Sequence, residues 1–164
     1  MTASISIREA REDDALSISN LMTELGYELS TSSVISRLTK YEGIGGRVWV
    51  ALEDSRVVGF LSFHFITYFH AAGRAGRITA MCVASTHRRS GIGHQLMHCM
   101  ENFAERMGCD RTEVMSGDHR EEEAHRFYQA EGYALSHRRF LKKLSKSEQD
   151  GVDQPATALE SKSE

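Results

Sequence analysis

The sequence predicts an α/β domain whose central sheet is mixed, mostly antiparallel and flanked by helices on both faces. Three expected strands follow one another between residues 47 and 84, and consecutive strands joined by short turns pair antiparallel. After residue 77 the pattern changes to strand, helix, strand, which favours a parallel pair. The 164 residues are 40% hydrophobic and 26% charged, which is enough for one such domain.

The first half of the chain predicts one strand, two helices and the start of the sheet. Residues 4–9 alternate apolar and polar side chains, as a strand does. Apolar residues then recur every three or four positions, which is typical of a helix, before Gly26 ends the pattern. The expected elements are a strand over 4–9, a helix from Asp13 or Asp14 to Gly26, a helix over 32–41, a strand over 47–52, a hairpin turn over 53–56 and a strand over 57–68.

The second half predicts alternating strands and helices. The clearest is a helix whose apolar face repeats every 3.6 residues. The expected elements are a strand over 77–84, a helix over 91–107, a strand over 111–115, a helix over 120–131 and a last extended segment over 133–144. The order is therefore β-α-α-β-β-β-α-β-α-β within a domain over 1–144. Residues 145–164 are polar with almost nothing to bury, so we expect a disordered tail.

Composition argues against two classes of partner. A formal charge of -3 and a pI near 6.2 give no electrostatic reason to expect nucleic acid or an anionic membrane. The longest apolar stretch, near 57–69, is too short and interrupted to cross a bilayer. The start of the chain lacks the pattern of a secretory signal. Three cysteines without C-x-x-C spacing, Cys82, Cys99 and Cys109, are expected to be reduced and buried, so we expect a cytoplasmic protein.

The segment Arg88-Arg89-Ser90-Gly91-Ile92-Gly93 lies between an apolar strand and an amphipathic helix. A helix start leaves its first backbone N–H groups unpaired and carries partial positive charge, so it suits an anion. Glycines at 91 and 93 remove Cβ atoms that would block a pyrophosphate. Arg88 and Arg89 add charge, and guanidinium groups bind phosphate oxygens bidentately.

A bare G-x-G pair is more often a tight turn beside solvated arginines, and here the strand before and the helix after favour the anion site. Two nucleotide alternatives fit poorly. A Walker loop requires Gly-Lys-Ser/Thr after four intervening residues, which is absent from the sequence. A dinucleotide fingerprint requires a third small residue where this chain has Leu96.

At this point the sequence resembles the GNAT superfamily of N-acetyltransferases. The family signature Arg/Gln-x-x-Gly-x-Gly/Ala is matched by Arg88, Gly91 and Gly93. A second motif, Ala-x-x-Phe-Tyr followed by Gly-Tyr/Phe, is matched by 124–128 and by Gly132-Tyr133. The likeness in element order extends over about residues 4–144.

The resemblance implies a GNAT-like fold and use of acetyl-coenzyme A, with no metal. Backbone amides from Arg89 to His94 would bind the pyrophosphate, and main-chain groups of a strand would pair with the pantetheine arm where the fourth and fifth strands splay. Tyr128 would protonate the leaving thiolate, and the backbone N–H of Val83 would face the developing oxyanion. Packing in the core is the alternative for Tyr128. The residues implied for the cofactor are Met81, Cys82, Val83, Arg88, Arg89, Ser90, Gly91, Ile92, Gly93 and His94.

The sequence departs from the family pattern at the residue expected to act as general base. Many relatives carry Glu or Asp on the fourth strand, where this chain has Thr79 and Ala80. The base candidates elsewhere are Glu24, Glu53 and His119, and the alternative is that no single base exists and water carries the proton to bulk. Tyr27 and Glu28 lie between the first two helices, either in contact with substrate or in a plain turn. His94 and His98, one helical turn apart, are read as exposed rather than as half of a zinc site.

The leading hypothesis is an enzyme that transfers acetyl to a primary amine of a small molecule or peptide by direct attack in a ternary complex. The alternative is a non-catalytic acyl-coenzyme A sensor or regulatory module. A third interpretation is an interaction domain whose glycine segment is a turn. The resemblance is compatible with a homodimer.

Overall fold

A computed structural model of the chain describes residues 4–116, 121–136 and 139–144. The strands it contains form one sheet in the order β1-β2-β3-β4-β5, with neighbours antiparallel except the parallel pair β4 and β5. The predicted mixed, mostly antiparallel sheet is confirmed. In chain order the elements are β1 (Ile5–Glu9), the 3-10 helix η1 (Glu12–Asp14), α1 (Ala15–Glu24), α2 (Thr31–Gly43), β2 (Arg47–Glu53), β3 (Arg56–Thr67), β4 (Arg74–Val83), the 3-10 helix η2 (Ser85–His87), α3 (Ile92–Arg106), β5 (Cys109–Val114) and α4 (Glu121–Ala130).

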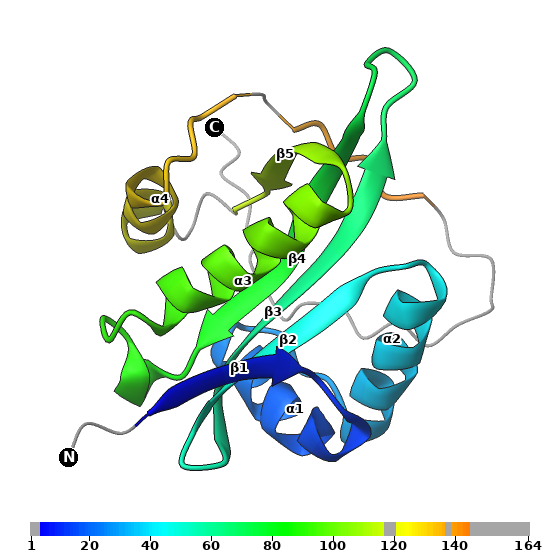
Figure 1. The fold of residues 1–164 in the computed structure, drawn as a ribbon. Helices are drawn as coiled ribbons and strands as arrows, with labels where there is room; N and C mark the ends of the chain where they lie inside the picture. The colour runs from blue at the N-terminus through cyan, green and yellow to red at the C-terminus, as the bar shows by residue number, and fades with distance from the viewer. Residues whose placement is uncertain (1–3, 117–120, 137–138, 145–164) are drawn as a thin grey trace, which may run out of the picture.

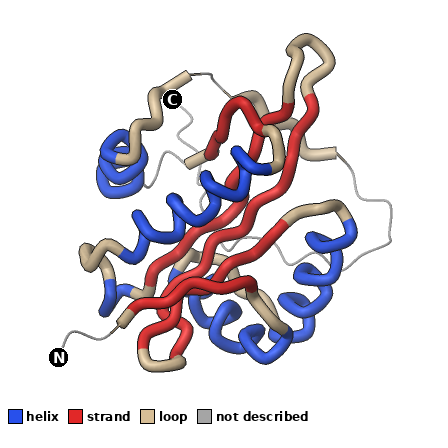
Figure 2. Tube along the Cα trace, in the orientation of Figure 1, coloured by secondary structure: helices blue, strands red, loops and turns tan. Residues whose placement is uncertain are grey.

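Helices cover both faces of this sheet (Figures 1 and 2). Helices α1 and α2 lie together on one face, where their apolar side chains meet Val50 and Phe60. Helix α3 lies on the other face and packs on Trp49, Leu61 and Phe63. Because side chains alternate along a strand, neighbours such as Trp49 and Val50 belong to different layers.

The apolar face predicted for α3 is the face that is buried. Ile92, Leu96 and Met100 recur at helical spacing and are at most 1% exposed. Burial of one such side chain contributes roughly 2 kcal/mol. Met107, predicted as the last member of this face, is 46% exposed because α3 ends one residue before it.

The last predicted strand is not observed in the described part of the chain. Residues 133–136 and 139–144 form no strand, and their apolar side chains Leu135, Phe140, Leu141 and Leu144 are exposed. A segment expected to be extended does not make a strand by itself, because a strand also needs a neighbouring ladder of hydrogen bonds. The sheet of the described residues therefore has five strands rather than six, and the predicted tail over 145–164 lies outside them.

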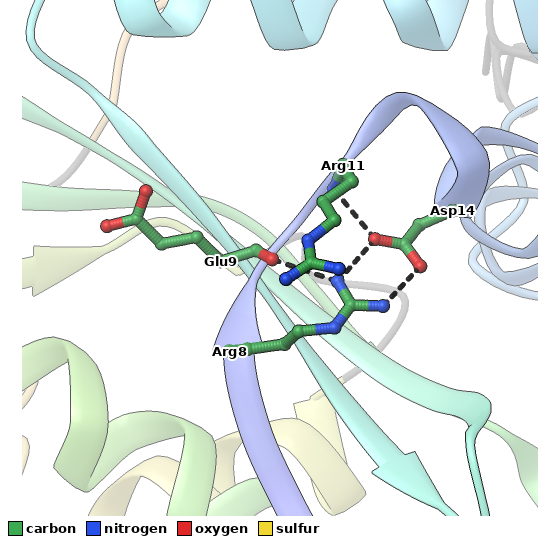
Figure 3. Close-up of polar contacts among 4 residues, drawn as sticks. All are labelled: Arg8, Glu9, Arg11 and Asp14. Carbon is green, nitrogen blue, oxygen red and sulfur yellow. Dashed lines mark hydrogen bonds and ion pairs between the residues drawn. The ribbon is translucent and has the colours of Figure 1, made fainter.

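A charged pair joins the end of β1 to the start of α1 (Figure 3). The guanidinium of Arg8 donates two hydrogen bonds, at 2.7 and 2.8 Å, to the carboxylate of Asp14, and the amide of Arg11 donates a third at 2.7 Å. Burial pushes the pKa of Asp14 upward, but these hydrogen bonds outweigh it and hold the pKa below its ordinary value. Asp14 therefore stays charged although it is buried.

Two further expectations concern the cysteines and the bilayer. All three cysteines are free, with Cys82 buried and both Cys99 and Cys109 partly buried. Burial raises the pKa of the thiols of Cys99 and Cys109. Among the residues that the structure describes, no helix combines the length and hydropathy needed to traverse a membrane.

Candidate active site

The segment 88–94 forms the turn that leads into α3. Arg89 (φ 62°) and Gly91 (φ 82°) take left-handed backbone conformations, and the hydroxyl of Ser90 donates to the carbonyl of His87. Gly91 is the residue that precedes the first helical position, Ile92. The first amides of a helix have no acceptor within it, so this turn offers N–H groups and partial positive charge to an anion.

The two glycines of the segment serve different purposes. A Cβ at Gly91 would have no heavy atom within 4 Å, so this position is open and glycine is favoured by its left-handed φ alone. A Cβ at Gly93 would lie 3.1 Å from ring carbons of Phe127 on α4. The expectation that glycine leaves room for a pyrophosphate therefore fits Gly91. At Gly93 the ring of Phe127 occupies the space next to the glycine.

Arg88 turns back toward the strand that precedes it. Its Nε donates to the carbonyl of Val83 at 3.3 Å, and its NH1 lies 3.7 Å from a carboxylate oxygen of Glu123 on α4. The side chain is 43% exposed. Arg88 thus joins the end of β4 to α4, whereas Arg89 is exposed at the surface of the turn.

Strands β4 and β5 pair along only part of their length. Their pairing ends at Ile78 and Val114, although β4 continues to Val83. Residues 80–83 keep their partners in β3 on the opposite side. Since a strand carries backbone polar groups along both edges, this stretch presents N–H and C=O groups toward the side on which β5 has ended. Met81, Cys82 and Val83, predicted to meet pantetheine, lie in this stretch.

Tyr128 lies on α4 and is half-buried. Its ring contacts those of Phe127 and Tyr133, with centroids 5.4 and 5.9 Å apart. The phenol of Tyr133 donates to Glu101 at 3.2 Å and shares a 2.7 Å hydrogen bond with Thr112. Burial, with Glu101 beside it, raises the pKa of Tyr133 far above its ordinary value. Tyr133 therefore ties α3 to β5 as a neutral phenol.

A pocket of about 410 Å³ lies between α1, α2 and the sheet. Tyr27 and Glu28, which the sequence suggested as substrate contacts, both line it. A mostly apolar hollow with a few polar groups is typical of sites for small ligands. The full lining is Ile18, Met22, Tyr27, Glu28, Leu29, Val34, Arg37, Leu38, Tyr41, Val48, Phe60, Ser62, Thr79 and Ala80.

Thr79 is the extra residue of a β-bulge in β4. The flanking pairs are Ser62 with Ala80 and Phe63 with Ile78, so residue 79 falls between them. The bulge turns two successive residues, Thr79 and Ala80, into the pocket. Of the two positions at which the resemblance would place a carboxylate, Thr79 thus carries a hydroxyl group and Ala80 a methyl group.

This hydroxyl belongs to a cluster of three. Thr79 Oγ1 lies 2.6 Å from the phenol oxygen of Tyr41 and 2.7 Å from Ser62 Oγ. Tyr41 and Ser62 were missed by sequence reasoning, because they lie 38 and 17 positions away and no local pattern marks them.

The carboxylates considered as bases lie away from this cluster. Glu24 accepts a hydrogen bond from a backbone amide after β4 at 2.9 Å, and Glu53 lies 3.0 Å from a ring nitrogen of His87. His119 lies outside the described residues. Among the described residues that line the pocket, Glu28 is the carboxylate.

The imidazole of His94 contacts a carboxylate. Its Nδ1 lies 2.9 Å from Glu131, and its ring stacks on that of His98 with centroids 6.4 Å apart. Across the described ranges, no group of three or more His, Cys, Asp or Glu residues is placed to hold a metal ion.

The strand, glycine turn and helix that form this site can be compared with known proteins. The family model of the GNAT acetyltransferases matches residues 16–133. The chain belongs to the GNAT family. The family resemblance drawn from the motifs at 88–93 and 124–133 is therefore confirmed.

Individual relatives agree with this assignment. An aminoalkylphosphonate N-acetyltransferase of Salmonella typhimurium is 39% identical over 95 residues, which make up 58% of this GNAT chain and 61% of that relative. An acetyltransferase of Trypanosoma brucei has a TM-score of 0.72 at 20% identity, with 86% of this chain and 100% of the other covered. Glucosamine-6-phosphate N-acetyltransferase of Arabidopsis thaliana has a TM-score of 0.72 at 17% identity, with 87% and 99% covered. The two solved structures are similar in fold.

Proposed function

We propose that this GNAT protein is an N-acetyltransferase that moves the acetyl group of acetyl-coenzyme A to the primary amine of a small molecule or peptide. The observation that carries the proposal is the turn at Gly91. It is left-handed, open to a methyl-sized group, and followed at once by the first amides of α3. A doubly charged pyrophosphate fits such a helix start.

The cofactor residues follow from this placement. Backbone amides from Arg89 to His94 hold the pyrophosphate, with Ser90, Gly91, Ile92 and Gly93 between them, and the guanidinium groups of Arg88 and Arg89 add charge. Main-chain groups of Met81, Cys82 and Val83 pair with the pantetheine arm as an added strand would. The end of the β4–β5 pairing at Ile78 and Val114 supports this second assignment.

Acetyl-coenzyme A supplies a thioester whose carbonyl carbon the neutral amine attacks directly in the ternary complex. A C–N bond forms and the C–S bond breaks. The amide N–H of Val83 stabilises charge on the carbonyl oxygen, and Tyr128 gives its phenolic proton to the departing sulfur. The amine binds as an ammonium group, loses one proton to water in the pocket before the attack and a second after it, and water restores the phenol of Tyr128.

For the acceptor we propose an amine joined by a short chain to an anionic group. The curated relative is named for aminoalkylphosphonates, which have this chemistry. Arg37 supports the proposal, because it is the cationic residue among the described residues that line the pocket. A guanidinium binds phosphonate or carboxylate oxygens bidentately. We expect Arg37→Gln to raise the KM of such an amine about tenfold or more. The KM of an amine of equal length that lacks the anionic group should change little.

Two measurements test the function. Calorimetry with acetyl-coenzyme A should show binding near the micromolar range, and no binding would support the interpretation of residues 88–93 as a plain turn. Release of free thiol is then followed over a panel of amines, with and without an anionic group. Binding without thiol release for any amine would favour the acyl-coenzyme A sensor over the enzyme.

We also propose a cytoplasmic location and a homodimer. The three cysteines are free, and reduced thiols are usual in that compartment. Fractionation of cells for the first and sedimentation of the purified chain for the second would test them.

A further inference from the structure

The hydroxyl cluster of Tyr41, Thr79 and Ser62 also contacts two carbonyl oxygens, and these contacts favour one direction of its hydrogen bonds. Ser62 Oγ donates to the carbonyl of Ala80 at 3.3 Å. A serine hydroxyl has one proton, so Ser62 accepts in its 2.7 Å contact with Thr79. Thr79 has then spent its own proton and accepts in its 2.6 Å contact with Tyr41. In this arrangement Tyr41 donates to Thr79, Thr79 donates to Ser62, and Ser62 donates to the carbonyl of Ala80.

The alternative donor contact of Thr79 leads to the same result. Thr79 Oγ1 can also donate to the carbonyl of Ser62 at 3.5 Å. Ser62 then donates to Thr79, and Thr79 again accepts from the phenol. In both arrangements the series of hydroxyl groups ends at a backbone carbonyl oxygen, which accepts hydrogen bonds and never donates them. When Ser62 or Thr79 keeps its proton on a carbonyl oxygen, the phenol of Tyr41 is the donor of the short bond, and its oxygen keeps a lone pair for the pocket.

Tyr41 is also fixed by its other neighbours. Its carbonyl accepts from the amide of Gly46 at 2.7 Å, and a Cβ at Gly46 would lie 3.0 Å from the ring of Tyr41. The edge of the ring meets His64 of β3 with centroids 6.3 Å apart. These neighbours hold the ring of Tyr41 beside β3, and the hydrogen bond to Thr79 directs its phenolic proton.

We propose that Tyr41 is a binding residue for the attacking amine, and that Thr79 and Ser62 are positioning residues that fix Tyr41 as a hydrogen-bond acceptor. This inference rests on the proposed acetyltransfer and on the pocket as its acceptor site. The phenol oxygen accepts an N–H bond from the amine and orients the nitrogen. The series of hydroxyl groups ends at peptide carbonyl oxygens, which accept hydrogen bonds but are not basic enough to take up a proton. The cluster therefore binds the amine and does not deprotonate it.

The test uses the full chain and kinetics with acetyl-coenzyme A and the best amine of the panel. Tyr41→Phe keeps the ring and removes the acceptor oxygen. We expect the KM of the amine to rise about tenfold to a hundredfold, the range of a charge-assisted hydrogen bond, with an unchanged KM for acetyl-coenzyme A. An equal rise in both constants, or no rise in the amine KM, would overturn the proposal.

The variant Thr79→Val tests whether Thr79 orients the phenol of Tyr41 or only supports the fold. Valine keeps the branched shape at the bulge but cannot accept the phenolic proton, so the phenol is free to point a donor at the ammonium group. We expect an increased KM for the amine, rescue by Thr79→Ser, and no further increase when Thr79→Val is added to Tyr41→Phe. Additive effects of the two changes would show that Thr79 does not act through Tyr41. Thermal melting of each variant checks that it is folded.

These outcomes are distinct from failure of the proposed function. If the wild-type chain binds acetyl-coenzyme A and acetylates no amine, the enzyme proposal fails and this one fails with it. If the wild type acetylates amines and Tyr41→Phe does so with unchanged constants, the function stands and the role of Tyr41 is refuted.

Discussion

Gly93 in the first turn of α3 lies directly against the ring of Phe127 on α4. A Cβ at position 93 would approach the Cε2 and Cζ atoms of that ring to 3.1 Å, which is closer than ordinary van der Waals contact. The two helices therefore meet at a point where glycine lets the ring sit without displacement. Tyr128 follows Phe127, so this contact links the proposed pyrophosphate turn to the helix that carries the proposed acid.

The two glycines of the turn should respond differently to alanine. Gly93→Ala should lower the melting temperature by roughly 2–6 °C, because Phe127 must shift by a few tenths of an ångström. Gly91→Ala should cost about 1 kcal/mol through its left-handed φ and should weaken acetyl-coenzyme A binding at least about tenfold, because its methyl group enters the open space. Calorimetry and thermal melting measure the two effects. Unimpaired cofactor binding by Gly91→Ala would contradict the proposed pyrophosphate position.

The sequence predicted those elements whose signal is local. Ile92, Leu96 and Met100 repeat along one helical face, and the face they predict is buried in the structure. Strand β4 was predicted to begin at residue 77 but begins at Arg74. Residues 74–76 carry little apolar pattern, and they are in a strand because they pair with β3 over 65–67. A pairing partner distant in the chain cannot be read from local composition.

The same distinction applies to the candidate site. The turn at 88–93 is a continuous motif, so the sequence located it. The hydroxyl cluster is not continuous in the sequence. A bulge in β4 turns Thr79 into the pocket, the register of β3 places Ser62 beside it, and α2 brings Tyr41 within hydrogen-bonding distance of Thr79. Register and bulges are set by pairing between strands, and a single sequence does not specify them. Arg37 lies on α2 and was missed because the packing of this helix against the sheet, which no local pattern specifies, decides that it lines the pocket.

Tyr128→Phe should lower kcat about a hundredfold while leaving acetyl-coenzyme A binding unchanged. Phenylalanine keeps the ring contacts with Phe127 and Tyr133 and removes the proton that the sulfur needs. Stopped-flow or steady-state release of thiol measures the change. Tyr133→Phe is the matched control, because it breaks the bonds to Thr112 and Glu101 and should lower thermal stability but not kcat. Equal activity of Tyr128→Phe and wild type would remove Tyr128 from the mechanism.

Gly76→Ala should destabilise the fold strongly. A Cβ at position 76 would overlap the ring of Phe63, which is fully buried in the core beneath α3. Overpacking of this kind costs about 1–3 kcal/mol or more, which lowers the melting temperature by several degrees or prevents folding. Gly43→Ala is the control, because a Cβ there would meet nothing within 4 Å. Denaturant titration of both variants measures their free energies of unfolding. An equal decrease in the two variants would refute the prediction.

The stability contributed by Asp14 should depend on pH in one direction. Its pKa is below the ordinary value because the bonds from Arg8 and the Arg11 amide outweigh the effect of burial. A carboxyl group whose pKa is lowered on folding stabilises the protein fully above its unfolded pKa of about 3.9, and this contribution disappears as pH falls through the folded pKa. Asp14→Asn should therefore cost about 2 kcal/mol at pH 7 and progressively less below about pH 4. Asp13→Asn, at an exposed neighbour, should change little at either pH. Denaturant unfolding across this range measures both variants, and a penalty for Asp14→Asn that is constant with pH would contradict the assignment.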